Sequence, residues 1–311
     1  MKPLAKIGRG VSRFWLSQSP LYMMLLPGML LLFLFSYMPM FGLVMAFTDF
    51  KPRLGFFGSP YVGLKWFDYL FNSSPDFSQV LTNTIVISLL KIAFGTAASL
   101  VFALLLNEAV VKWFKSAVQT ITYLPNFLSW VVVGGMFIDI LSQDGIINRI
   151  LHAFGSPGVF FLGSNHWFRS VIVATDVWKN FGFGAVLYIA AIASINRDLY
   201  EACVVDGGGR FQQMRHVTLP GIMPTLIMLT TLNLGQIMNA MNGGQDQILV
   251  LYNPSVYETG DILDTFAYRT GIIDVQYSFA TAVGLFKSVV GLVLIVSANR
   301  LSIKYASRRI F

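Results

Sequence analysis

The feature that most constrains the fold of this chain is a set of long apolar stretches. A helix that crosses a lipid bilayer needs about 20 mostly apolar residues, and the sequence contains about six such stretches. They are Leu21–Phe47, Thr84–Leu106, Ala117–Leu141, Ser170–Ile195, Leu219–Met241 and Phe279–Asn299. Within lipid, every backbone polar group must find its hydrogen bond inside the protein. The sequence therefore predicts an all-α membrane protein with about six transmembrane helices.

Composition agrees with this fold class and excludes others. Hydrophobic residues make up 55% of the chain and charged residues only 12%, against about 25% charged residues in a soluble domain. Too few polar residues remain to cover a soluble enzyme. The net charge of +7 comes from short basic clusters beside the apolar stretches, as in cytosolic loops of membrane proteins. We therefore expect a membrane as the environment and no nucleic acid as a partner.

The distribution of Lys and Arg predicts the orientation. With the N-terminus inside, the cytosolic segments are 1–20, 107–116, 196–218 and 300–311. Basic residues are roughly threefold denser there than in the outside loops, as the positive-inside rule requires. Both termini are then cytoplasmic, and the first stretch is a retained span rather than a cleaved signal peptide. We predict an N-terminal arm at 1–20, a transmembrane domain at 21–299 and a C-terminal tail at 300–311.

The segment between the fourth and fifth spans, residues 196–220, predicts a short helix at the membrane surface. Asp198 followed by Glu201 looks like the start of a capping box. The glycines 207–209 would end the helix, because glycine accepts the left-handed conformation of a C-cap. A second short helix then leads to Pro220. So short a helix is not stable alone, and its small residues would let a partner approach closely.

This segment resembles the EAA loop of permease subunits of binding-protein-dependent ABC importers. The family pattern is Glu-Ala-Ala, three residues, Gly, nine residues, Ile, one residue and Leu-Pro. Here the matching positions are Glu201-Ala202-Cys203, Gly207 and Val217-Thr218-Leu219-Pro220. Cys203 and Val217 depart from the pattern conservatively. Further runs resemble the oligosaccharide or polysaccharide branch of the maltose-type sugar permeases: 37–50, 123–130, 178–184, 252–254 and 264–271.

The resemblance implies an importer subunit of a bacterial plasma (inner) membrane. In that family a coupling helix docks on a cytosolic ATPase, and an external binding protein delivers the sugar. The implied coupling residues are Tyr200, Glu201, Ala202, Cys203, Asp206 and Gly207. The implied partners are a second permease subunit, two copies of a P-loop ATPase, an extracytoplasmic substrate-binding protein and membrane lipid. The second permease is commonly a related but different chain, and pairing with a second copy stays open.

The chain lacks sequence signals for chemistry of its own. It has no Gly-rich phosphate-binding loop followed by Lys and Ser or Thr, the usual site of ATP. Its three histidines lack metal-ligand spacing. We therefore expect a non-catalytic subunit without a cofactor, with ATP and magnesium bound by the partner ATPase.

Polar residues inside spans predict the substrate path. Asn233, Gln236 and Asn239 recur every three residues in the fifth span, with Asn242 continuing the series. Such a neutral stripe suits sugar hydroxyls, although hydrogen bonding between helices is the alternative.

In the fourth span we assign Trp178, Lys179 and Asn180 to the same path. Ionisable residues within spans are costly and therefore functional candidates. Asp176 lies three residues before Lys179, so the two can share a helix face and pair with each other.

Two further alternatives concern the outside and the transport class. The last outside loop, residues 242–278, holds five acidic residues and one arginine, so it is either a solvated acidic loop or a docking surface for an external partner. A secondary transporter or channel is the alternative function. That class predicts inverted repeats or a selectivity loop, and it leaves the EAA-like segment unexplained.

Overall fold

The computed structural model describes residues 21–239 and 244–306. These residues fold almost entirely into helices, which confirms the predicted all-α fold class. After the first span, the α-helices are α2 Gly55–Gly58, α3 Lys65–Asp68, α4 Phe77–Glu108, α5 Lys112–Tyr123, α6 Trp130–Leu141, α7 Ile146–Ala153, α8 Asn165–Ala193, α9 Arg197–Val205, α10 Arg210–Gln213, α11 Leu219–Gly235, α12 Gly244–Leu251, α13 Tyr257–Gly260, α14 Leu263–Tyr268 and α15 Tyr277–Ala306.

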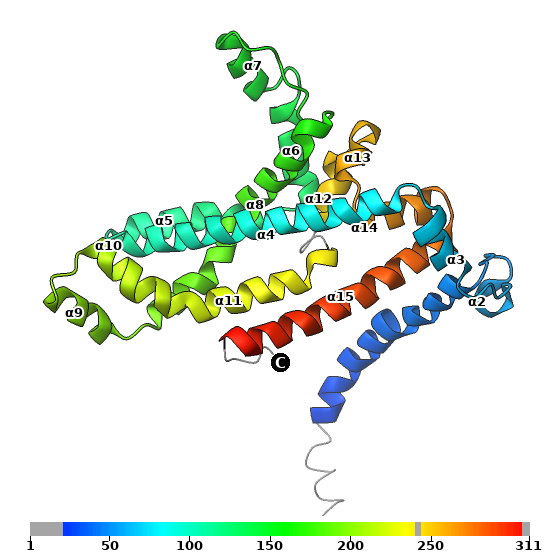
Figure 1. The fold of residues 1–311 in the computed structure, drawn as a ribbon, viewed down its shortest axis with the longest axis horizontal. Coiled ribbons are helices and arrows are strands. Elements are labelled where there is room, and N and C mark those ends of the chain that lie inside the picture. The colour runs from blue at the N-terminus through cyan, green and yellow to red at the C-terminus, as the bar shows by residue number, and fades with distance from the viewer. Residues whose placement is uncertain (1–20, 240–243, 307–311) are drawn as a thin grey trace, which may run out of the picture.

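The long helices build an elongated bundle with α9 and α10 at one end and α2 and α3 at the other (Figure 1). Its buried apolar side chains form three separate clusters. One cluster is centred on Phe266 and Phe279 beside α15, and the next surrounds Phe168 on α8. The third joins Tyr188 of α8 to Ile222 of α11. Burial of apolar surface thus holds α4, α8, α11 and α15 together.

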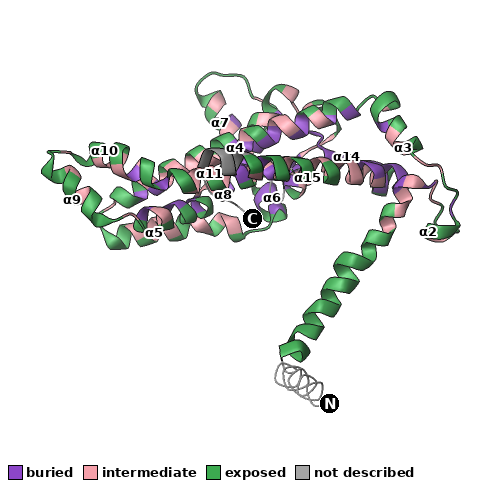
Figure 2. Cartoon of the chain, turned by 60° about the horizontal axis from the view of Figure 1, so that its bottom comes forward, coloured by how far each residue is buried: buried purple, intermediate pink, exposed green. Residues whose placement is uncertain are grey.

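The predicted spans are mostly present. Among the described residues, five helices are long and apolar enough to cross a membrane. A sixth span results if α8 is counted together with α9, across a bend of 70°. The first, Leu21–Phe47, stands away from the bundle (Figures 1 and 2). Only 6% of its most apolar 18-residue stretch is buried. Its surface is therefore free to contact lipid or another chain.

The third span departs from the prediction of one helix over Ala117–Leu141. The chain breaks at η4, a 3-10 turn at Leu124–Phe127, because Pro125 cannot donate a backbone hydrogen bond. A new helix, α6, begins at Trp130, where the Ser129 side chain caps the Val132 amide at 3.4 Å. The apolar helical stretch here is Trp130–Ala153, which includes α7.

The fifth span ends earlier than predicted. Instead of reaching Met241, α11 stops at Gly235, a poor helix former. A short 3-10 turn, η6, follows at Ile237–Asn239. The predicted polar stripe is therefore not continuous on one helix.

The segment after residue 243 is folded and only partly solvated. Asp261 is 1% exposed and pairs with Arg269 at 2.5 Å, while Asp264 pairs with Lys287 of α15. Burial raises the pKa of the Asp261 carboxyl, and hydrogen bonds from Thr265 and Arg269 oppose that shift. A wholly solvated acidic loop is therefore the wrong description of this segment.

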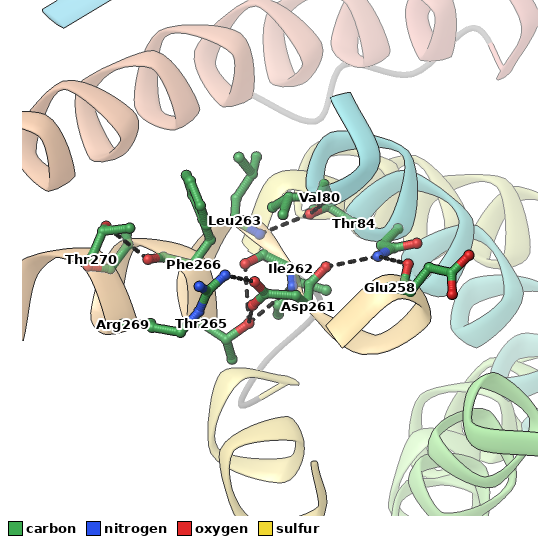
Figure 3. Close-up of polar contacts among 12 residues, drawn as sticks. Val80, Thr84, Glu258, Asp261, Ile262, Leu263, Thr265, Phe266, Arg269 and Thr270 are labelled. Carbon is green, nitrogen blue, oxygen red and sulfur yellow. Dashed lines mark hydrogen bonds and ion pairs between the residues drawn. The ribbon is translucent and has the colours of Figure 1, made fainter. Parts of the chain in front are cut away.

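Long-range hydrogen bonds seat the same segment on α4 (Figure 3). The Asn83 side-chain amide donates to the carbonyls of Glu258 and Asp261 at 3.0 and 3.1 Å. The Leu263 amide donates to the Thr84 hydroxyl at 2.9 Å. Buried polar groups are costly unless they are paired, so these bonds define one arrangement of α13 and α14 against α4.

Candidate translocation cavity and coupling helix

A cavity of about 620 Å³ opens between α4, α8, α11 and the break in the third span. Its lining residues with polar groups are Lys91, Thr96, Ser99, Asn126, Ser129, Trp130, Asp176, Lys179, Asn180, Tyr188, Asn233 and Asp246. A larger groove of about 790 Å³ runs between α4 and α8, and its lining is almost wholly apolar. Because sugars need hydrogen-bond donors and acceptors, the polar cavity is the candidate site.

The break in the third span builds one wall of this cavity. The Asn126 carbonyl accepts a hydrogen bond from Lys179 Nζ at 2.9 Å, and the Asn126 side-chain amide donates to Asn180 Oδ1 at 3.0 Å. The Lys179 ammonium also lies 5.4 Å from the centre of the Trp130 ring. Irregular backbone at membrane depth is tolerated where it lines a cavity. Here it supplies hydrogen-bond partners to Lys179 and Asn180 of α8.

A buried charge pair joins α4 to α8 beside the cavity. Lys91 Nζ lies 3.3 Å from Asp176 Oδ1, and it donates to Gln247 Oε1 of α12 at 2.6 Å. Gln247 in turn donates to Thr175 Oγ1 at 2.8 Å. The spacing predicted that Asp176 pairs with Lys179, but the close ion pair of Asp176 is with Lys91 on another helix. The side chain of Lys91 is completely buried and takes the nearby carboxylate as its counter-charge.

The remaining predicted path residues separate into two groups. Asn233 lines the cavity together with Lys179 and Asn180. Gln236 and Asn239 do not, since they lie beyond the end of α11 and bond to each other at 2.6 Å. Asn242 lies outside the described residues.

Trp178 faces away from the polar cavity. It lines the apolar groove and packs edge-on against Phe137, with ring centres 5.3 Å apart. Sequence reasoning missed Asn126 and Trp130 as cavity residues. The one signal for them was Pro125, an interruption in an otherwise apolar stretch.

The helix α9 confirms the predicted short helix between the fourth and fifth spans, with a different start. Asn196, not Asp198, caps it, because the Asn196 side chain accepts the Asp198 amide at 3.1 Å. At the other end Gly207 has φ +78°. The Gly208 amide donates to the Cys203 carbonyl at 2.8 Å, which completes a Schellman cap. Termination by glycine is confirmed.

The surface of α9 is open. None of its residues is buried (Figure 2). Val205 is 87% exposed. The predicted coupling residues Glu201, Ala202 and Asp206 are all exposed. Tyr200 instead points inward and shares a 3.0 Å hydrogen bond with Thr218 at the base of α11.

Along the chain, helix α9 lies between α8 and α11, two helices that line the cavity. It follows α8 after the 70° bend. It precedes α11 through α10 and η5, a π-helical turn at Met214–Thr218. A displacement of α9 would therefore reach two walls of the cavity.

Known proteins resemble this chain along nearly its whole length. Protein LplB of Bacillus subtilis (strain 168) is 39% identical over 99% of this chain and 97% of its own length. The polygalacturonan/rhamnogalacturonan transport system permease protein YteP of the same strain is 40% identical, over 95% and 91%. A solved chain from a bacterial ABC transporter involved in the import of the acidic polysaccharide alginate is 39% identical. It superposes with a TM-score of 0.85 over 96% of this chain and 99% of that one.

The family model described as binding-protein-dependent transport system inner membrane component matches residues 95–306. That range is more than half of the chain, and it includes the cavity walls of α8 and α11 as well as α9. This protein therefore belongs to the family of binding-protein-dependent transport system inner membrane components.

Proposed function

We propose that this chain is the permease subunit of an ABC importer that brings an oligosaccharide or related carbohydrate into a bacterial cell. The observation that carries the proposal is the position of α9, an exposed helix inserted between two helices that line a polar cavity. A secondary transporter or channel works without an ATPase and therefore needs no exposed helix on which one docks. The carbohydrate is supported by the relatives, whose names and titles refer to alginate and to polygalacturonan or rhamnogalacturonan.

The resemblance to permease subunits of ABC importers implies the mechanism, and the position of α9 is compatible with it. A cytosolic ATPase dimer binds α9 around Glu201, Ala202 and Gly207 and closes when it binds ATP. The closure displaces α9, and α8 and α11 move with it. The cavity then changes its access from one side of the membrane to the other. ATP and the loaded external binding protein both favour the outward-open state, and hydrolysis of ATP resets it.

The same resemblance implies the partners. This subunit binds neither ATP nor magnesium; two copies of a P-loop ATPase do. A second permease subunit completes the cavity and covers apolar surface that this chain leaves exposed. An extracytoplasmic binding protein delivers the carbohydrate. The α9 end of the bundle faces the cytoplasm, in agreement with the basic residues of segments 196–218 and 300–311.

A two-step experiment tests the proposal. The tagged chain is purified in mild detergent, and the proteins that accompany it are identified by mass spectrometry. The complex is then reconstituted in vesicles with its binding protein, and uptake of labelled oligosaccharide is measured with and without ATP. Recovery of a P-loop ATPase and ATP-dependent uptake are the expected results. A chain that is recovered alone and transports without ATP would establish a secondary transporter instead.

A further inference from the structure

The ammonium group of Lys179 is an incompletely satisfied charge at the wall of the cavity. The residue is 5% exposed, and Nζ donates one hydrogen bond, to the Asn126 carbonyl. An ammonium group has three donors. In the part of the chain that the structure describes, the carboxylates that lie within 4.0 Å of a basic side chain pair with Lys91, Arg269 and Lys287, and none pairs with Lys179.

Two acidic residues, Asp176 and Asp246, line the same cavity as Lys179, and neither lies within 4.0 Å of its ammonium group. Asp176 precedes Lys179 by one helical turn and attracts it electrostatically, but its ion pair, at 3.3 Å, is with Lys91. Asp246 is exposed on α12. The buried ammonium groups of Lys91 and Lys179 thus share one buried carboxylate, so a carboxylate that arrives with the substrate would stabilise this site.

The neighbours of Lys179 suit the rest of a sugar. Trp130 lines the same cavity with the Lys179 ammonium over its ring, so the indole supplies apolar surface beside the charge. The side chains of Asn126, Asn180 and Asn233 line the same space. Neutral amides both donate to and accept from hydroxyl groups. The site thus combines one cation with a flat apolar surface and neutral hydrogen-bonding groups.

We propose that Lys179 recognises a carboxylate of the transported carbohydrate, so that the cavity prefers oligosaccharides containing uronic acid units over neutral ones of equal length. This inference rests on the proposed import of carbohydrate and adds the substrate class and the residue that selects it. The free N–H groups of Lys179 donate charge-assisted hydrogen bonds to the carboxylate, and these are stronger than bonds to a neutral hydroxyl.

The test compares two substrates in the complete importer. Vesicles containing the permease pair, the ATPase and the binding protein take up a uronic acid oligosaccharide or its carboxyl-reduced, neutral counterpart. The variants are Lys179→Gln, Lys179→Arg and, as a matched cavity control, Asn233→Ala. The binding protein is the same in every sample. Its own preference therefore cancels when each variant is divided by the wild type for the same substrate.

Lys179→Gln should raise the KM for the acidic oligosaccharide by about tenfold to a hundredfold, the size expected for a lost charge-assisted hydrogen bond. Its KM for the neutral counterpart should stay within about twofold of the wild type. Lys179→Arg should retain most of the preference, and Asn233→Ala should affect both substrates equally.

Equal losses for both substrates in Lys179→Gln would overturn the role of Lys179, as would a wild type that takes up only the neutral compound. ATP-independent uptake, or no uptake of either compound by the wild type, would instead overturn the proposed function. The two failures are therefore distinguishable.

Discussion

The α9 end of the bundle and the segment that contains α13 and α14 are built in opposite ways. In the α13 and α14 segment, the buried Asp261 and Leu263 bond to Asn83 and Thr84 of α4, far away in the sequence. At the α9 end the hydrogen bonds are mostly local, and Tyr200 to Thr218 is the side-chain bond that ties described residues of α9 to another element. The α13 and α14 segment is stabilised by the chain itself. The α9 end leaves its helix open, which is typical of a surface that another protein covers.

The largest expected effect is at the cap of α9. Gly207→Asp places a side chain at φ +78°, where L-residues are strained, and Glu201→Ala removes an exposed carboxylate. We expect uptake to fall by about a hundredfold or more, since the coupling step governs the cycle. ATP hydrolysis and the amount of protein in the membrane should persist. Uptake assays in vesicles measure this.

Gly209→Asp is the matched control for the cap. Gly209 has φ −76°, and a Cβ there would approach only the Gln212 side chain, at 4.0 Å. Aspartate is also a favourable residue at a helix N-cap. Near-normal uptake is expected of this control. If Gly207→Asp or Glu201→Ala transports normally, the coupling role is wrong.

The next effect concerns stability and is expected in the α13 and α14 segment. Asp261→Asn removes the counter-charge of Arg269, whose side chain is 21% exposed. Loss of one partner of a buried pair costs about 3 kcal/mol of unfolding free energy, and less where water reaches the other partner. Thermal unfolding in detergent should show a lower midpoint, while binding of the ATPase stays unchanged. An unaltered midpoint would remove the contrast between the α9 end and the α13 and α14 segment.

A smaller effect is expected at Val205, which is 87% exposed. Burial of a valine under a partner contributes about 1.5 kcal/mol, so Val205→Asp should weaken binding of the ATPase by about tenfold or more. The unfolding midpoint should not change, because the side chain makes little contact within the chain. Titration of the ATPase against the purified permease measures the affinity. Equal affinity would place the docking surface elsewhere.

The smallest effect concerns the link from α9 to α11. Tyr200→Phe deletes the 3.0 Å hydrogen bond to Thr218, worth about 1 kcal/mol. We expect a few-fold rise in ATP hydrolysed per sugar transported, because α9 then moves less tightly with α11. The converse variant Thr218→Val should give the same ratio. Different ratios would mean that the two side chains act independently.

Local patterns predicted much of the fold. Apolar length alone located most of the spans, because lipid leaves a buried backbone few options other than a helix, but the third span is broken and the fifth ends early. Gly207 predicted the end of α9 for an equally local reason. The break at Pro125 was not predictable, since proline within a span is compatible with either a kink or a complete interruption. Whether neighbouring helices re-satisfy the backbone decides between them.

The candidate site was less predictable, because it depends on pairing between distant elements. Spacing favoured Asp176 with Lys179, three residues apart, whereas the structure pairs Asp176 with Lys91 on another helix. The choice depends on how α4 crosses α8. Likewise, Asn126 enters the site only because the third span breaks beside α8. The sequence identified Asp176 and Lys179 as candidates but not their partners, Lys91 and the Asn126 carbonyl.

The buried pair of Lys91 and Asp176 has a consequence for how the protein is made. Each charge is inserted into the bilayer within its own hydrophobic segment, α4 first and α8 later in synthesis. A lone charge at the centre of a span opposes insertion, and only the arrival of α8 neutralises Lys91. We therefore expect the association of α4 with α8 to stabilise both helices in the bilayer during synthesis.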